Sequence, residues 1–255
     1  MNPDSRRLAK QFAYGIFFCI FWAAIIWGGY KTFFAVPPSC FDNKQNQNEA
    51  GVDCGGVCPD CALRALRPVE VVSQRYFLLN DNPTLLLEVR NPNPLYGAVK
   101  LPYVVEIRDM NTSNKNLQSV NGETFIYPGE NKYTIIDLPG LTADSNAEIV
   151  FGTPTWEGAV EFSSPKITFR GVTSKLEGNG NIFISGVLQN NETLLFPRVI
   201  INALFFDGNY NVIGVSKTEI QDILAFEERY FQIEHPQLPN LDLAKTRLFF
   251  EANRP

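Results

Sequence analysis

Residues 85–94 read LLLEVRNPNP, and residues 182–191 read IFISGVLQNN. Each stretch is an apolar run that ends at an asparagine, and Asn and Pro favour the turns that follow strands. A second run comes after each of them, YVVEIRD at 103–109 and VIINALFFD at 199–207, and both end at an aspartate. Short runs separated by turn residues, without longer helical patterns between them, predict an all-β fold.

The two pairs of runs take matching places in the two halves of the chain beyond residue 66. Asn91 and Asn190 are roughly one hundred residues apart, which is the size of one β-sandwich domain. The aspartates that end the second runs have nearly the same separation, and a constant offset of this kind indicates an internal repeat. We therefore predict two tandem copies of one β-sandwich, at residues 67–158 and 159–255.

Polarity alternates along the second run of the first copy. Tyr103, Val105 and Ile107 fall on one side of an extended strand, whereas Glu106 and Arg108 fall on the other. This alternation predicts a strand with one buried face and one solvated face.

The repeat resembles the FxLYD domain and the related late-embryogenesis-abundant type 2 domains, which are immunoglobulin-like or fibronectin-like sandwiches of bacterial envelope and stress proteins. The second copy is the closer match, and its matching positions are Gly186, Leu188, Asn190, residues 203–207 and 212–214, Phe226 and Phe231. It departs from the name-giving motif at Ala203 and Phe205. The first copy, with NPNP at 91–94, is closer to the late-embryogenesis type. The resemblance implies a fold and brings no catalytic residues.

An apolar segment precedes the repeat. Residues 12–30 read FAYGIFFCIFWAAIIWGGY, and their only ionisable side chains are two tyrosines and one cysteine. A bilayer core requires about 20 apolar helical residues, so we predict a transmembrane helix at 11–31 that makes the lipid bilayer a partner. The alternative is a cleaved signal peptide, but the run is longer than a usual signal core and no small-x-small cleavage site follows it. The sequence therefore favours an uncleaved signal anchor.

Charge around this segment predicts its orientation. Arg6, Arg7 and Lys10 precede the helix, whereas Lys31 alone follows it at once. Because basic flanks stay on the cytoplasmic side, residues 1–10 are expected in the cytoplasm and the bulk of the chain outside it. The predicted protein is a single-pass membrane protein.

Four cysteines, Cys40, Cys54, Cys58 and Cys61, lie together in residues 37–61. Clustered cysteines in an oxidising compartment predict two disulfides in a segment too small for a hydrophobic core, and three pairings are possible. The segment resembles a small module of modular secreted and surface proteins, C-x-D-x-x-x-N-x-x-E-x-G-x-D-C-G-G-x-C-x-x-C. We expect a stiff stalk between the anchor and the sandwiches.

The same segment carries candidate metal ligands. Closely spaced oxygen donors suit calcium, which takes six to eight oxygens, and the candidates are Asp42, Asn46, Asn48, Glu49 and Asp53. Asn, Asp and Gly are also ordinary turn residues, and the spacing is not that of an EF-hand. A zinc site built from the four thiolates is a further alternative, which the predicted oxidising location disfavours.

Several function classes lack their sequence signals. His235 is the only histidine, and the sequence has no nucleophile motif that it could activate as a catalytic base. The sequence also has no phosphate-binding loop and no dinucleotide fingerprint. We therefore expect no enzyme, although a hydrolase that uses paired carboxylates is a third hypothesis. The net charge of −5, without a basic patch, argues against nucleic acid as a partner.

The functional prediction follows from the order of the segments. An anchor, a cross-linked stalk and paired non-catalytic sandwiches indicate a structural or protein-binding component of the cell envelope, with other envelope proteins as its partners. The alternative is a calcium-responsive or ligand-responsive binding module.

Overall fold

The computed structural model describes residues 3–33, 39–79, 82–110, 116–142, 144–178 and 180–254. The chain divides into two compact units, Met1–Ala65 and Leu66–Pro255. The predicted start of the cysteine segment, at Pro37, falls outside the described residues.

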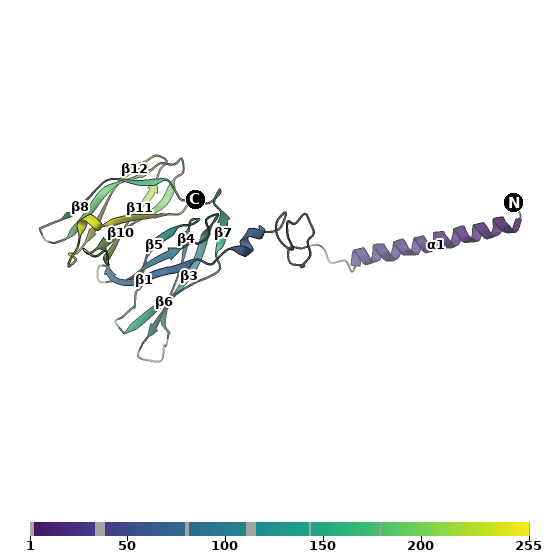
Figure 1. Cartoon of the computed structure of the whole chain (residues 1–255), viewed down its shortest axis with the longest axis horizontal. Helices are drawn as coiled ribbons and strands as arrows, with labels where there is room; N and C mark the ends of the chain where they lie inside the picture. Colours follow the sequence, from purple (N-terminus) through teal and green to yellow (C-terminus); the bar gives the residue numbers. More distant parts are fainter. Residues whose placement is uncertain are drawn as a thin grey trace. The chain divides into compact units, whose positions relative to one another are not determined.

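The first unit begins with one long helix, α1 (Pro3–Phe33), drawn in purple in Figure 1. Its stretch Lys10–Thr32 has 23 residues with a mean hydropathy of 1.8, and none of its apolar surface is buried in the protein. By length and composition this helix is able to cross a membrane, and its place near the N-terminus also fits a signal sequence. The remainder of this unit is the cysteine segment, which ends in the 3-10 helix η1 (Cys61–Ala65).

The second unit is built from antiparallel strands (Figure 1). Those of its first half are β1 (Glu70–Leu79), β2 (Asn82–Arg90), β3 (Tyr96–Asp109), β4 (Asn116–Ile126), β5 (Asn131–Asp137), β6 (Ser145–Phe151) and β7 (Thr155–Gly158). Those of its second half are β8 (Ile167–Leu176), β9 (Ile182–Asn190), β10 (Phe196–Phe206), β11 (Val212–Ile223), β12 (Glu228–His235) and β13 (Arg247–Ala252), with the 3-10 helix η2 (Leu243–Lys245) before β13.

The two halves have the same strand order. In the first half one sheet has the order β1-β2-β5 and the other has the order β4-β3-β6, with β7 paired to the start of β3. In the second half the sheets have the orders β8-β9-β12 and β11-β10-β13. Each strand from β1 to β6 thus has its counterpart in β8 to β13. The prediction of an all-β fold that follows a single apolar helix is confirmed.

Each half has a hydrophobic core between its two sheets. In the first half Val105 and Ile107 of β3 are fully buried in that core, and Tyr103 packs against it. Glu106 and Arg108 face away and form an ion pair with each other. The alternation predicted for this strand is therefore confirmed. The second core has the same plan and includes Phe196 and Phe205, which are fully buried.

A third apolar cluster joins the two halves. Leu86 of β2 and Ile135 of β5 contribute to it from the first half, and Leu204 of β10 and Val215 of β11 contribute from the second half. Sheet β1-β2-β5 therefore packs against sheet β11-β10-β13. This explains the run of leucines at 85–87, all of which are buried: their sheet has a core on each face, so both faces of β2 are apolar.

The same strand positions are polar where the sheets face away from the junction. The pairing of Leu86 with Ile135 recurs in the second half as Ser185 with Gln232. The pairing of Leu204 with Val215 recurs in the first half as Glu106 with Ser119, on the outer face of the β4-β3-β6 sheet. Equivalent positions are thus apolar where the halves meet and polar where they do not.

Candidate functional site

The predicted site residues of the cysteine segment are brought together in a small knot. Cys40 is bonded to Cys58, and Cys54 is bonded to Cys61, with Cα–Cα separations of 5.6 and 4.8 Å. This is one of the three pairings that the sequence allowed. Because all four sulfurs are bonded in pairs, they do not supply the thiolates that the zinc alternative requires.

Two buried carboxylates organise the backbone of this knot. Asp53 accepts hydrogen bonds from the backbone N–H groups of Asp42 and Asn43 at 2.9 to 3.1 Å. Glu49 Oε2 accepts from the N–H groups of Asn46 and Asp53, both at 3.1 Å, and its other oxygen lies 3.0 Å from Cys58 Sγ. These carboxylates therefore take the place of a hydrophobic core in fixing the loop.

Asp42 and Asn46 add further hydrogen bonds within the same loop. Asp42 accepts hydrogen bonds from the backbone N–H of Lys44 and from the side-chain amide of Asn46, both at 2.9 Å. The bond from Asn46, followed by bonds from backbone N–H groups, holds the pKa of Asp42 below its usual range. The fifth candidate ligand, Asn48, is exposed and has a left-handed backbone with φ 63°. The geometry thus commits Asp42, Glu49 and Asp53 to hydrogen bonds within the loop, and calcium binding stays an alternative that the sequence suggests.

The backbone around Gly55 and Gly56 leaves no room for a side chain at either position. Both glycines have positive φ, at 75° and 64°. A Cβ at Gly56 would lie 2.3 Å from the carbonyl oxygen of Asn48, and one at Gly55 would lie 2.6 Å from Cβ of Ala50. No L side chain fits at either position without moving the chain.

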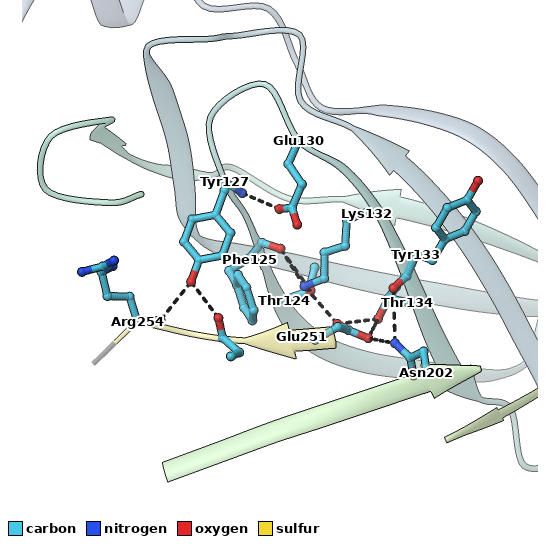
Figure 2. A network of polar contacts seen from close by, with 11 residues as sticks. Thr124, Phe125, Tyr127, Glu130, Lys132, Tyr133, Thr134, Asn202, Glu251 and Arg254 are labelled. Atoms are coloured by element: carbon cyan, nitrogen blue, oxygen red, sulfur yellow. Dashed lines mark hydrogen bonds and ion pairs between the residues drawn. The ribbon is translucent and has the colours of Figure 1, made fainter. Parts of the chain in front are cut away.

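A polar network at the junction of the two halves was not predicted from the sequence, and Figure 2 shows it. At its centre Lys132 of β5 and Glu251 of β13 form an ion pair of 3.0 Å, and their side chains are only 3% and 8% exposed. Lys132 Nζ also donates to Thr124 Oγ1 and to the carbonyl oxygen of Phe125, and lies 3.5 Å from the centroid of the Phe125 ring. The ammonium group is therefore enclosed by partners from the first half and one carboxylate from the second.

Glu251 is held by donors from both halves. Thr134 Oγ1 donates to its two oxygens at 3.1 and 3.0 Å, and Asn202 Nδ2 donates to Oε1 at 2.7 Å (Figure 2). A buried ion pair is stable only when its remaining hydrogen-bonding capacity is used, which these contacts achieve in large part. The network thus fixes the register between β5 and the β10–β13 sheet.

The last residues of the chain complete the junction. Tyr127 Oη donates to the carbonyl oxygen of Ala252 at 2.7 Å and accepts from the backbone N–H of Arg254 at 3.1 Å (Figure 2). Burial raises the pKa of Tyr127, so its hydroxyl stays protonated and able to donate. At the other side of the junction Lys217 pairs with Asp137 at 2.9 Å.

An open cleft of about 420 Å³ lies beside this network. Its walls combine apolar side chains with charged ones from both halves, among them Tyr103, Ile136, Arg198, Ile200, Lys217 and Glu251. Burial, followed by the negative charges of Glu251 and Asp137, raises the pKa of Tyr103. Two of the charged groups that line the cleft belong to ion pairs, Arg198 with Glu219 and Lys217 with Asp137.

One sequence signal would have located the junction. Aligning the two copies on Asn91 and Asn190 places Leu86 opposite Ser185, and a buried residue opposite a polar one marks a face that is covered in one copy only. The buried charges carry no such signal, because Lys132 and Glu251 look like ordinary solvated strand residues.

A comparison of the chain with protein-family models finds no match, and a search of curated proteins also finds none. The FxLYD-type resemblance therefore has no independent support from these comparisons and stays a prediction.

Proposed function

We propose that this chain is a single-pass, membrane-anchored protein of the cell envelope, with α1 as an uncleaved anchor and the β-rich unit on the extracytoplasmic side. The observation that carries the proposal is the order of the segments: a helix long enough to span a bilayer comes directly before a knot held by two disulfides. Disulfides persist in oxidising compartments, so the knot belongs outside the cytoplasm. The basic residues Arg6, Arg7 and Lys10 support the same orientation.

In this proposal the β-rich unit is a structural or protein-binding component with no catalytic role. Its two halves share an apolar cluster and a buried ion pair, which favours a rigid pair of sandwiches over two freely moving domains. The repeated strand order supports the further proposal that both are immunoglobulin-like sandwiches of FxLYD type. Other envelope proteins would be the partners, bound through sheet faces or edge strands.

Thiol labelling of intact cells tests the anchor and the orientation together. Two variants, each with one free cysteine beside the two disulfides, are compared in a Cys19→Ser background: Ser5→Cys at the N-terminal end of α1 and Ser163→Cys in the β-rich unit. A membrane-impermeant maleimide should label residue 163 without cell lysis and residue 5 only after lysis. Alkaline extraction should leave the protein in the membrane pellet. Labelling of residue 5 in intact cells, or release of the protein as a shortened soluble chain, would refute the proposal.

Crosslinking tests the protein-binding part. A photo-crosslinker placed on the outer face of β3 at Glu106 should give discrete adducts with envelope proteins in living cells. The matched control is a crosslinker at Leu86, which faces the junction and should give none. Equal adduct patterns at both positions, or none at any outer position, would count against a binding role.

A further inference from the structure

Three exposed apolar side chains gather at one end of the second half, and we call them the apolar tip: Leu195, Leu224 and Phe226. Their side chains are 40%, 55% and 63% exposed. Asn190 holds the two loops of the tip together, because its Nδ2 donates to the carbonyl oxygens of Leu194 and Leu224 at 2.7 and 2.8 Å. The tip is therefore a constructed surface rather than three isolated residues.

Phe226 occupies a position where the first half has a glycine. The backbone N–H of Phe226 donates to the carbonyl oxygen of Glu192, and the N–H of Gly129 donates to that of Asn93 in the same way. Their φ angles are 58° and 65°. A bulky residue in the left-handed region is strained, and such strain at an exposed turn is grounds for proposing a function for the side chain. Tyr210 has a similar backbone, but its ring lies 4.2 Å from the ammonium group of Lys245.

In the first half the chain itself covers the residue that takes the place of Leu224. Tyr127, which is equivalent to Leu224, is 2% exposed. Its ring stacks on Phe162 with 4.4 Å between centroids, and its hydroxyl donates to the carbonyl oxygen of Ala252. The repeat thus buries an apolar residue at this position in one copy and presents one to the surroundings in the other.

Both turns lie at the end of the β-rich unit at which that unit begins. Arg254 connects them, because its backbone N–H donates to Tyr127 Oη while its guanidinium pairs with Glu192 at 2.9 Å. Asn93, beside the turn of the first half, donates to the carbonyl oxygen of Arg67 at 2.8 Å and accepts from its backbone N–H. The apolar tip and the start of the β-rich unit, near Arg67, therefore share one end of that unit.

Two glutamates next to the tip are neutralised by arginines. Glu192 is bound by Arg254, and Glu227 is bound by Arg229 at 2.6 Å. Bonds from the backbone N–H of Leu224 and from Arg229 lower the pKa of Glu227, so it stays ionised and paired. Paired charges around an aromatic and two leucines suit the headgroup region of a membrane, where such side chains concentrate.

We propose that the apolar tip rests in the headgroup region of the lipid bilayer and holds the β-rich unit against the membrane. This inference relies on the proposed function, since α1 must anchor the chain. A lipid surface is favoured over a protein partner because the start of the β-rich unit and the tip share one end, and tethering makes even a weak contact effective. The tip then fixes how the unit is presented to its partners.

Depth-dependent fluorescence quenching tests this contact in the full-length protein, reconstituted into phosphatidylcholine vesicles in a Cys19→Ser background. One reporter is attached at Ala225→Cys, in the turn of the tip. The matched control is attached at Asn209→Cys, an exposed position in the hairpin at the other end of β10. A quencher carried on the lipid headgroups should abolish most fluorescence at 225 and leave fluorescence at 209 unchanged.

Phe226→Gly is the decisive variant, because it copies the first half and relieves backbone strain without threatening the fold. It should lower quenching at 225 in reconstituted protein. Absence of quenching at 225 would overturn the inference, and so would equal quenching at both positions. Failure of alkaline-resistant insertion would instead refute the anchor, so the two failures are distinguishable.

Discussion

Asn91 and Asn190 make the same four hydrogen bonds in the two halves of the β-rich unit. Each backbone N–H donates to a glutamate carbonyl, of Glu130 or Glu227, and each side-chain oxygen accepts a backbone N–H two residues further on. Each side-chain amide donates to two carbonyl oxygens of neighbouring turns. Both asparagines are almost completely buried, so each connects a strand end to two loops that water does not reach.

Replacing either asparagine by alanine should destabilise the protein by a similar amount. Asn91→Ala and Asn190→Ala each leave buried carbonyl groups without donors, which we expect to cost about 2 to 3 kcal/mol. Urea unfolding followed by circular dichroism measures the loss. Asn191→Ala is the control, because that side chain is exposed and its change should stay within about 0.5 kcal/mol. A loss as large for Asn191 as for Asn190 would contradict the account.

The ion pair of Lys132 and Glu251 should be costly to break from one side. Lys132→Met leaves a buried carboxylate unpaired, and we expect a loss of about 3 to 5 kcal/mol. Removing both charges, as Lys132→Met with Glu251→Leu, should restore much of that stability. The exposed pair Arg170 and Glu228 supplies the control, with an expected effect below about 1 kcal/mol. Additive losses in the double variant would argue against a coupled pair.

Glu130 should contribute to the pH dependence of folding stability. Burial raises its pKa above the usual 4.5, although the N–H of Tyr127 opposes the shift. The folded state then holds its proton more tightly than the unfolded state, so this group favours folding at low pH and opposes it once pH exceeds the folded pKa. Glu130→Gln should therefore remove the loss of stability that begins as the pH rises above 4.5, and so stabilise the protein once Glu130 is ionised. Denaturant titrations at several pH values check this, and an unchanged pH profile would be contrary evidence.

Calcium should have little effect on the cysteine knot. Asp53 and Glu49 already accept backbone N–H groups, which a cation would have to displace. We therefore expect no shift in melting temperature between calcium-loaded and chelator-treated protein, measured by scanning calorimetry. A stabilising shift that Asp53→Asn removes would instead favour the calcium site predicted from the sequence.

Local patterns in the sequence were enough to predict the strands and the apolar helix. The alternation at 103–108 follows from one buried sheet face, and the run from Phe12 to Tyr30 is long and apolar enough to predict a helix. The cysteine spacing was enough to predict two disulfides, but their pairing depends on loop geometry that Asp53 and Glu49 impose through hydrogen bonds.

The junction could not be predicted because it depends on how two sheets meet. Lys132 and Glu251 are distant in sequence, and each lies among ordinary strand residues. Only the packing of sheet β1-β2-β5 on sheet β11-β10-β13 brings them together. The apolar tip could not be predicted either, because the positive φ of Phe226 is a property of the folded backbone.

Hydrogen exchange in the whole protein tests most directly whether the two halves form one unit. The most protected amides of β3 and β9, which lie in the two outer sheets, should open with the same free energy because the junction couples the halves. The variant Leu86→Ser with Ile135→Gln, which copies the second half, should make these values diverge. Different opening free energies for β3 and β9 in the unmodified protein would contradict the account.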